Sequence, residues 1–445
     1  MRRISQKIAQ KGLLYPIIGL VACMTFMYIS IGGFGTHEKE SQLSFVGREG
    51  TQFINNGKPF YVNGWNSYWL LIQSVEERNR PRITAMFESA AAMGLTVCRT
   101  WAFNDGAYDA LQISPGKFDE RVFKGLDMVI AEAQRHGIKL LLSLINDWSD
   151  FGGKIQYVKW AKEAGLNSIS SNDSFFFDPY IRSCFKNYLK TIITRKNHLT
   201  GIEYRDDPTI FAWELMNEPR CDSDPSGTTL QNWIEEMASY VKTIDNKHLL
   251  TVGIEGFYGP SSSHKFKFNP GEYFKNLGSD FIQNSEVAAI DFCSVHIYPD
   301  LWLPAKTTLL EKKIFVSNWV ISHIKDGEEV LNKPVLFTEF GLSTKNNKTS
   351  YSHRDEFYKH IFDLIYKSAL NKGAGAGSFI WQLLVDGMDN LSDEFGVVPK
   401  KRPTLYRLLK GQSCRLAKVS GVKKWEWFHS AFESKKEWRV SEGDC

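Results

Sequence analysis

Apolar residues along this chain gather in eight short runs, and longer segments with helical spacing separate them. Apolar runs bounded by turn residues are typical of strands that are buried on both faces of a parallel sheet. They predict strands at residues 95–100, 138–145, 209–219, 249–253, 290–298, 333–341 and 378–381, and the β-prone run that ends at Val62 continues into a first strand at residues 63–66.

The segments between these runs carry apolar residues at three- and four-residue intervals, which predicts helices with one buried face. The predicted helices cover residues 82–93, 119–135, 179–196, 230–244, 309–324, 354–370 and 404–409. Eight strands that alternate with helices predict an α/β fold, the (β/α)8 TIM barrel. An open doubly wound sheet is the alternative, but no glycine-rich phosphate loop follows any early strand.

Two shorter elements flank the predicted barrel. Asn56-Gly57 lies between two β-prone runs and predicts an N-terminal hairpin with a two-residue turn. Residues 413–445 are basic and aromatic and form a short C-terminal extension, either a strap packed on the barrel or a mobile tail. Residues 41–412 are therefore predicted to form one barrel domain.

The first 40 residues differ from the rest of the chain. Four basic residues within the first eleven positions precede an apolar run over residues 12–35. A basic flank followed by an apolar core predicts entry into the secretory pathway, with the bulk of the chain on the lumenal or outer side. The run is long enough to span a bilayer and no Ala-x-Ala site ends it, so residues 1–40 are either a cleaved signal peptide or an uncleaved type II signal anchor.

Composition narrows the class of partner. With 445 residues, 43% of them apolar, the chain can bury one large core. The net charge is only +4 and the basic residues are spread along the sequence, which argues against a nucleic-acid partner. Thirteen Trp and seventeen Tyr are more than the core needs, and aromatic rings stack well on the apolar faces of sugars.

The cysteines and histidines do not indicate a metal site, because no zinc template and no His-x-His motif occurs. Cys98 and Cys293 lie in predicted strands and are expected to be buried thiols. Four other cysteines could form one or two disulfides in an oxidising compartment: Cys184, Cys221, Cys414 and Cys445. Three Asn-x-Ser/Thr triplets are compatible with secretion: Asn172, Asn347 and Asn390.

Two glutamates end two of the predicted strands. Residues 209–219 end in Asn217 and Glu218, and residues 333–341 end just after Glu339. A carboxylate at the carboxyl end of a buried strand is costly to desolvate, so it has either a partner or a chemical task. Many strand-end glutamates are merely paired ions, but two of them above one barrel form the pair that glycoside hydrolysis requires.

Other side chains are predicted to surround this pair at the same end of the barrel: Arg99, Asn217, His296, Tyr298 and Trp381. Strand alternation puts Glu214 two positions below Glu218 on one face, where we expect a structural ion, paired with a buried cation.

The mechanism of glycoside hydrolysis requires one neutral and one charged carboxyl group. Arg99 and Tyr298 would keep Glu339 charged by attraction and hydrogen bonding, so that Glu339 attacks the anomeric carbon. Glu218, farther from this cation, would then be the acid/base, and the ring of Trp381 would form the floor on which the sugar stacks.

The run Asp207-Pro-Thr-Ile-Phe-Ala-Trp-Glu-Leu-Met-Asn-Glu-Pro-Arg-Cys221 resembles the acid/base strand of plant endo-β-1,4-mannanases in glycoside hydrolase family five. The resemblance extends from about Phe45 to Gln412, and the chain departs from the family pattern in its long apolar leader and in its tail after Gly411. Further segments resemble the same group in the same order: Cys98-Arg-Thr-Trp-Ala-Phe103, Phe151-Gly-Gly-Lys154, Gly256-Phe-Tyr-Gly259, Val295-His-Ile-Tyr-Pro299, Pro334-Val-Leu-Phe-Thr-Glu-Phe-Gly341 and Trp381-Gln382.

The resemblance implies retaining endo-hydrolysis of β-1,4 bonds in mannan, galactomannan and glucomannan of cell walls, by a secreted enzyme without a cofactor. It implies Glu218 as acid/base and Glu339 as nucleophile, and it implies substrate binding by Arg99, Trp101, Asn217, His296, Tyr298 and Trp381. Two alternatives stay open: a retaining endo-β-glucanase on the same barrel and a catalytically silent wall-binding protein.

Overall fold

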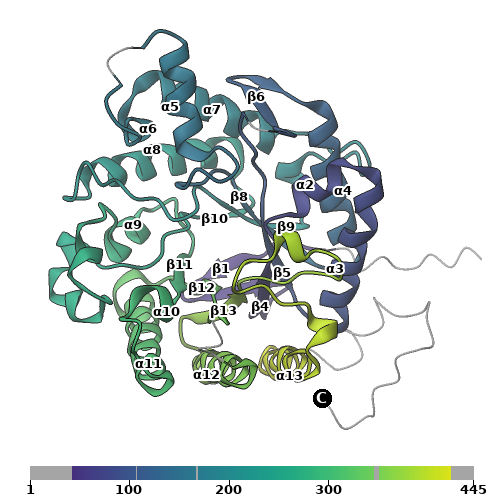
Figure 1. The fold of residues 1–445 in the computed structure, drawn as a ribbon, viewed down its shortest axis with the longest axis vertical. Helices are drawn as coiled ribbons and strands as arrows, with labels where there is room; N and C mark the ends of the chain where they lie inside the picture. Colours follow the sequence, from purple (N-terminus) through teal and green to yellow (C-terminus); the bar gives the residue numbers. More distant parts are fainter. Residues whose placement is uncertain (1–42, 107, 167–168, 345–349, 422–445) are drawn as a thin grey trace, which may run out of the picture. The chain divides into compact units, whose positions relative to one another are not determined.

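An eight-stranded parallel sheet forms the centre of the structure, a computed structural model that describes residues 43–106, 108–166, 169–344 and 350–421. The strands are β4 (Val62–Asn66), β5 (Val97–Trp101), β8 (Lys139–Ser143), β9 (Ile210–Glu214), β10 (Leu249–Thr251), β11 (Cys293–Ile297), β12 (Val335–Phe340) and β13 (Gly375–Ile380). All eight predicted strands are present in the predicted order, and helices lie between them as expected for a (β/α)8 barrel (Figure 1).

The sheet is nearly closed into a barrel. Each strand pairs in parallel with the next one along the chain, and the last, β13, pairs with the first, β4. Strands β10 and β11 are the exception, because no ladder joins them. Single contacts bridge this seam: the Asp291 N–H donates to Leu250 O (2.8 Å) and the His296 N–H donates to Glu255 O (2.9 Å).

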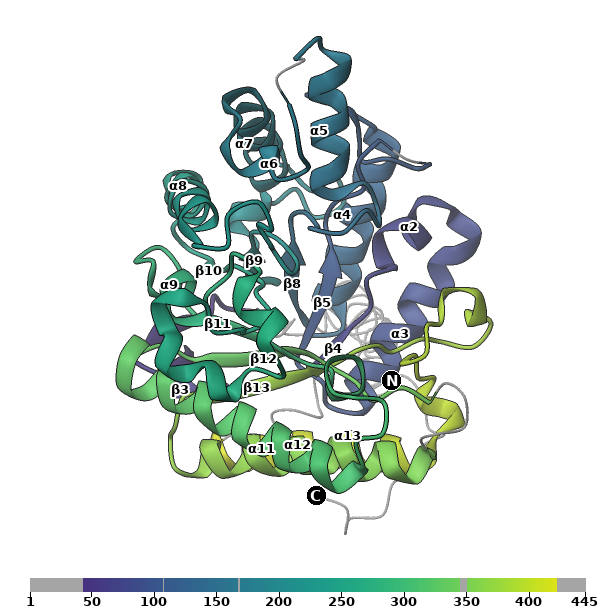
Figure 2. The ribbon, with the colours of Figure 1, turned by 60° about the vertical axis from the view of Figure 1, so that its left-hand side comes forward.

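Helices surround the sheet, and α11, α12 and α13 lie side by side along one side of it (Figures 1 and 2). The α-helices are α2 (Leu70–Val75), α3 (Arg80–Ala92), α4 (Glu120–Arg135), α5 (Gly153–Glu163), α6 (Ser174–Phe177), α7 (Pro179–Ile193), α8 (Thr228–Ile244), α9 (Phe281–Glu286), α10 (Pro299–Trp302), α11 (Leu309–Asp326), α12 (Tyr351–Leu370) and α13 (Pro403–Val419). Shorter helical turns are η1 (Glu77–Asn79), η2 (Tyr204–Asp206), η3 (Pro260–Phe268), η4 (Glu272–Asn276), η5 (Gly327–Leu331), η7 (Asp389–Leu391) and η8 (Pro399–Lys401).

Side-chain caps explain where several helices begin. Asp178 accepts hydrogen bonds from the Tyr180 and Ile181 N–H groups at the start of α7, and Pro179 occupies the first helical position. At the start of α11, Thr308 and Glu311 form a reciprocal capping box.

The predicted N-terminal hairpin is present as β2 (Gln52–Asn55) and β3 (Lys58–Pro59), with β1 (Gly47–Glu49) added at its edge. Asn56 and Gly57 have φ values of 50° and 73°, as a two-residue turn of this kind needs. The Phe53 ring from this hairpin lies 5.3 Å from the Phe211 ring and 5.4 Å from the Phe292 ring. Aromatic packing therefore ties the hairpin to the barrel core. A second hairpin consists of β6 (Gln112–Ser114) and β7 (Lys117–Phe118).

Two predictions about element lengths were wrong. The loop expected after the third barrel strand contains α5, and the last helix, α13, ends at Val419 rather than at Leu409. The side chain of Asn63 in β4 donates to Leu409 O (3.0 Å) and to Ser413 Oγ (2.7 Å), so the middle of α13 is bonded to the sheet.

The cysteines only partly follow expectation. Cys98 and Cys293 are buried thiols as predicted, and Cys414 is disulfide-bonded. Cys184 and Cys221 are free thiols, so the prediction that they could join a disulfide is wrong. Asn172 and Asn390 of the predicted glycosylation triplets are exposed, and Asn347 lies outside the described residues.

The predicted leader, residues 1–40, lies outside the described residues, as does most of the C-terminal extension. Within the part of the chain that the structure describes, no helix combines the length and the apolar character needed to cross a bilayer.

Candidate active site

The carboxyl ends of the barrel strands bring together all eight residues that the sequence singled out. Arg99 comes from β5, His296 from β11 and Glu339 from β12, while the others follow directly after a strand or end one. Four of them form one hydrogen-bonded cluster: Arg99, Asn217, Tyr298 and Glu339. Glu218 and His296 form a bonded pair next to it, with His296 Nδ1 3.7 Å from Glu339. Trp101 and Trp381 lie beside this cluster.

Glu218 does not lie in a strand, contrary to the predicted alternation. Strand β9 ends at Glu214, and Glu218 has a φ of 50°, in the left-handed region. Its backbone N–H donates to Gly253 O (2.9 Å), which fixes this turn against the neighbouring chain. The carboxylate accepts from Trp148 Nε1 (2.7 Å) and lies 2.6 Å from His296 Nδ1.

Glu339 has the neighbours that the sequence predicted. Arg99 Nη1 donates to one carboxylate oxygen (2.6 Å), and the Tyr298 hydroxyl donates to the other (2.6 Å). Only 4% of Glu339 is exposed. Charge-assisted hydrogen bonds on both oxygens hold this carboxylate in one orientation.

The prediction that Glu214 is a structural ion is confirmed, because it forms a buried ion pair with Arg99 at 2.6 Å. Ser143 also donates to Glu214. Arg99 is fully buried and donates to Asn217 Oδ1 (2.7 Å) as well as to both glutamates. One guanidinium therefore fixes side chains from three regions of the barrel end, including the residue before Glu218.

The two candidate catalytic carboxyl groups are close together. One oxygen of Glu218, one oxygen of Glu339 and one ring nitrogen of His296 all lie within 4.8 Å of one another. Retaining glycosidases hold their carboxyl groups roughly 5 Å apart, whereas inverting enzymes leave a wider gap for water. The same three side chains are also the group within the described residues whose spacing would suit a metal ion.

The charges of these three groups depend on one another. Burial raises the pKa of Glu218, but the hydrogen bond and charge of His296 outweigh burial and lower it to about 2. Burial lowers the pKa of His296, and the two carboxylates outweigh that effect and raise it. Burial raises the pKa of Glu339, and His296 and Arg99 offset the rise only in part. These shifts favour the charged pair, a protonated His296 beside a charged Glu218.

This proton distribution differs from the sequence-based expectation. The prediction weighed Arg99 as the only cation and placed Glu218 away from positive charge, whereas His296 lies 2.6 Å from Glu218. His296 also approaches Glu339 to 3.7 Å, so it lies between the two carboxylates.

Aromatic rings form one side of the site. Trp381 stacks on Tyr68 with ring centroids 5.8 Å apart and lies 6.0 Å from Trp101. The Trp381 indole N–H donates to Asp393 (2.7 Å), and the Arg99 guanidinium lies 4.9 Å from the centre of the Trp101 ring. Trp381 is partly exposed and Trp101 is buried.

Sequence reasoning missed a second group of residues around Glu218. Arg220 lies 4.9 Å from the Trp148 ring and forms an ion pair with Glu255. Burial, together with the charge of Glu218, raises the pKa of Glu255 to about 7 despite the attraction of Arg220. In the sequence, the only indication of this group is that Arg220 lies two positions after Glu218. Trp148 and Glu255 come from other loops, so their positions in the sequence do not relate them to Glu218.

Comparisons with known proteins agree with this geometry. The profile of the family described as "GH family 5 beta-mannosidase-like" matches residues 43–388. The chain belongs to this glycoside hydrolase family. The family 5 chain is 59% identical to mannan endo-1,4-beta-mannosidase 2 of Arabidopsis thaliana over 412 residues, covering 92% of this chain and 95% of the relative. It is 55% identical to mannan endo-1,4-beta-mannosidase 2 of Oryza sativa subsp. japonica over 423 residues, again covering 92% and 95%.

A solved structure supports the architecture of this family 5 chain. The hyperthermostable endo-1,4-beta-D-mannanase of Thermotoga petrophila RKU-1 superposes with a TM-score of 0.69 at 32% sequence identity, covering 80% of this chain and 99% of the other. The shared fold accounts for the nearly closed barrel and for the placement of the site at its carboxyl end.

Proposed function

We propose that this chain is a retaining endo-β-1,4-mannanase that cleaves mannan, galactomannan and glucomannan of cell walls by double displacement. The observation that carries the proposal is the approach of Glu218 and Glu339 to within 4.8 Å at the carboxyl end of the barrel. The names of the relatives given above describe endo-1,4-β-mannosidases that act on mannan, and these relatives match this chain over nearly its whole length.

In the first step, a Glu339 oxygen attacks the anomeric carbon while the bond to the leaving sugar oxygen breaks. Glu339 must be charged to attack, and Arg99 and Tyr298 hold its two oxygens at 2.6 Å each. The leaving oxygen takes a proton from Glu218. In the second step Glu218 removes a proton from water, and the resulting hydroxide releases the sugar from Glu339.

The proton on Glu218 has to come from a neighbour. We propose that it passes from His296 Nδ1 to the Glu218 oxygen 2.6 Å away when the sugar displaces water from the site. Exclusion of water removes the solvation that favours the charged pair, so the neutral pair gains relative stability. Every step uses only these side chains, the sugar and water, and none needs a metal ion or a cofactor.

The remaining predicted residues would bind the sugar. Asn217 would contact the 2-hydroxyl of the sugar at the cleavage point, and Arg99 fixes its amide by a 2.7 Å hydrogen bond. Trp381 would stack on the sugar ring, and Asp393 holds its indole in place. Trp101 would act by supporting Trp381 and Arg99.

We also propose that the protein is a secreted glycoprotein of the cell wall, with residues 41–412 as the catalytic domain and residues 413–445 as an extension. The basic and apolar leader supports this location, and so does the exposure of Asn172 and Asn390. N-terminal sequencing of protein from the native source would separate a cleaved signal from a type II anchor. A start near residue 41 in soluble protein is the expected result, and an intact leader in the membrane fraction would contradict it.

The test of the activity compares galactomannan with carboxymethylcellulose, using purified protein with and without EDTA. We expect reducing sugar only from the mannan, retention of anomeric configuration by NMR, and the same rate in EDTA. Faster release from carboxymethylcellulose would make the protein a β-glucanase instead, and binding to mannan without turnover would make it a silent wall-binding protein.

A further inference from the structure

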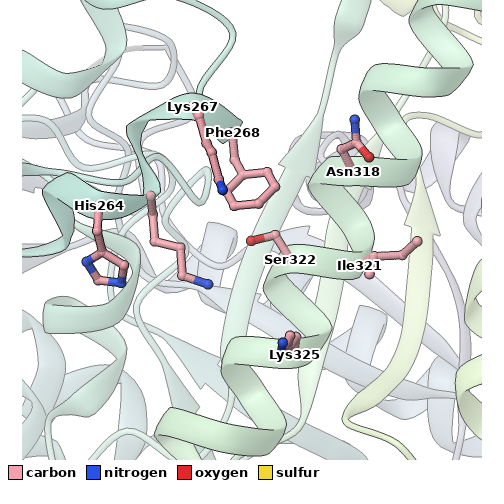
Figure 3. Close-up of a pocket in the computed structure, with 8 residues that line it drawn as sticks. His264, Lys267, Phe268, Asn318, Ile321, Ser322 and Lys325 are labelled. Carbon is pink, nitrogen blue, oxygen red and sulfur yellow. The ribbon is translucent and has the colours of Figure 1, made fainter.

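A cavity of about 300 Å³ lies on the outside of the barrel, between η3 and α11 (Figure 3). His264, Lys267 and Phe268 come from η3, while Ile321 and Lys325 come from α11. This volume is at the lower end of the range for small-molecule sites. None of the eight residues of the candidate active site lines it.

The cavity has an apolar face. The Phe268 ring is half-buried and packs against the Tyr258 ring, with centroids 6.3 Å apart. Ile321 on α11 also lines the cavity, and 54% of its surface is exposed. A half-buried aromatic ring in a hollow that an exposed aliphatic side chain also lines offers a surface for the C–H face of a sugar ring.

Positive charge surrounds this face, and part of it is not neutralised. Lys267 lies on the exposed surface 5.2 Å from the centre of the Phe268 ring, and no acidic side chain of the described residues pairs with it. Among the described residues, the one ion-pair partner of Lys325 is Glu329, at 3.6 Å, and both side chains are more than half exposed. Exposed pairs of this kind are weak, so another carboxylate can replace Glu329.

A third lysine has a structural role and keeps the cavity in shape. Lys265 forms an ion pair with the buried Asp326 at 2.6 Å, and the Tyr258 hydroxyl donates to the same carboxylate at 2.7 Å. This network joins η3 to the last turn of α11. Lys267 and the weakly paired Lys325 therefore line the cavity from two elements that this network holds together.

We propose that this cavity binds uronic acid units of an acidic polysaccharide. The carboxylates would pair with Lys267 and Lys325, and the sugar ring would lie against Phe268 and Ile321. A free inorganic anion would use the cations but not the apolar face, and a neutral mannan would use the face but not the cations. The cavity would thus hold the enzyme on acidic polymers next to its neutral substrate, independently of the proposed catalysis.

Calorimetric titration with three probes tests the proposal: oligogalacturonate, its methyl ester and poly-L-glutamate. We expect the full-length protein to bind oligogalacturonate. It should bind the ester and the polypeptide at least about tenfold more weakly, because the ester lacks the carboxylates and the polypeptide lacks the sugar rings. The double substitution Lys267→Glu with Lys325→Glu should abolish binding of oligogalacturonate. Hydrolysis of mannohexaose should stay unchanged, because neither lysine lies in the active site.

Two further variants distinguish specific binding in this cavity from nonspecific electrostatic attraction of the anionic ligand. The control Lys162→Glu with Lys190→Glu changes the net charge of the protein by the same amount as the Lys267/Lys325 variant, but at positions on α5 and α7. It should leave oligogalacturonate binding intact. Phe268→Ala should weaken oligogalacturonate without changing poly-L-glutamate. Equal losses in both double variants, poly-L-glutamate binding as tight as oligogalacturonate, or full binding by the Lys267/Lys325 variant would each overturn the proposal.

Discussion

Glu218 and Glu339 have the same side chain, but their neighbours give them different chemistry. Glu339 accepts hydrogen bonds from Arg99 and Tyr298, whose donors are fixed by the barrel. Glu218 instead lies 2.6 Å from His296 Nδ1, a group that can carry a proton. A carboxylate with fixed donors suits attack on carbon, whereas one in contact with a proton carrier suits transfer of a proton.

Replacing Glu218 by Ala should affect substrates unequally. Hydrolysis of manno-oligosaccharides should fall by about 10²–10⁴-fold, because their leaving oxygen needs a proton. Dinitrophenyl mannobioside has a leaving group that departs without a proton, so the first step should be nearly unaffected, and the glycosyl-enzyme should accumulate as a burst. Equal slowing of both substrates in stopped-flow assays would remove Glu218 from the acid role.

The pH profile of kcat/KM should report Glu339 and His296. Activity should fall on the acidic side as Glu339 gains a proton, at a pH above the ordinary range for Glu because its pKa is raised. Activity should fall on the alkaline side as the pair of His296 and Glu218 loses its proton, above the ordinary His range because the pKa of His296 is raised.

Two variants show which group causes the acidic limb and which the alkaline limb of the pH profile of kcat/KM. His296→Gln should move the alkaline limb to lower pH, because the proton must then stay on a carboxyl group. Tyr298→Phe should move only the acidic limb, to higher pH, since it removes a hydrogen bond that stabilises charged Glu339. An alkaline limb that does not move in His296→Gln would contradict the proposed proton donor.

At the scale of elements, Asp245 ties three parts of the barrel together. It follows α8, accepts from Trp213 Nε1 in β9 (2.8 Å) and lies 2.6 Å from His248 Nδ1, just before β10. His248 Nε2 in turn lies 2.9 Å from Asp207 O. Burial raises the pKa of Asp245, but the His248 hydrogen bond and charge outweigh it and lower the pKa to about 2.

Replacing Asp245 by Asn should lower the free energy of unfolding at pH 7 by about 1.5–3 kcal/mol, the usual range for buried hydrogen bonds to a charged group. The folded pKa lies below the unfolded value of about 3.9, so the charged group stabilises the fold above that pH. The penalty should shrink as pH falls from about 4 toward 2. Urea unfolding at several pH values measures it.

The exposed pair of Asp206 and Lys247 provides a matched control. Asp206→Asn should change the free energy of unfolding by less than about 1 kcal/mol at any pH. A penalty for Asp245→Asn no larger than this control would show that the buried contacts do not stabilise the fold.

Periodicity was sufficient to find the eight strands, because parallel barrel strands are apolar on both faces. It failed for Glu218, since the chain leaves β9 at Glu214 and turns through a positive φ that no residue pattern marks. The contacts of Glu218 with Trp148 and of Arg220 with Glu255 join loops that are distant in sequence. Only the closed sheet brings these loops together, so the pattern of a single segment could not reveal them.

At the scale of the whole molecule, every barrel strand lies after residues 1–40, the predicted leader. All eight strands lie between residues 62 and 380, and the buried core described around them begins at Val46. A chain of residues 43–445 should therefore melt at the same temperature as the full chain and hydrolyse mannohexaose with the same kcat/KM. Scanning calorimetry and product analysis would measure both quantities.

A truncation at the other end should behave differently. Ending the chain at residue 402 removes α13, whose Leu409 carbonyl and Ser413 hydroxyl bond to Asn63 in β4. We expect that protein to be insoluble or to melt far earlier. Stable, active protein without α13 would contradict the prediction that this helix is needed for the fold. Loss of activity in the chain of residues 43–445 would contradict the prediction that residues 1–42 are not needed.

The missing ladder between β10 and β11 has a consequence for motion. Amide protons along an edge that is bridged by few hydrogen bonds exchange with solvent through small openings rather than through global unfolding. Deuterium should therefore enter residues 249–255 and 291–296 before it enters the paired strands β4 and β5. His296 lies on this edge, so we expect the proposed proton carrier to lie in a part of the sheet that exchanges early.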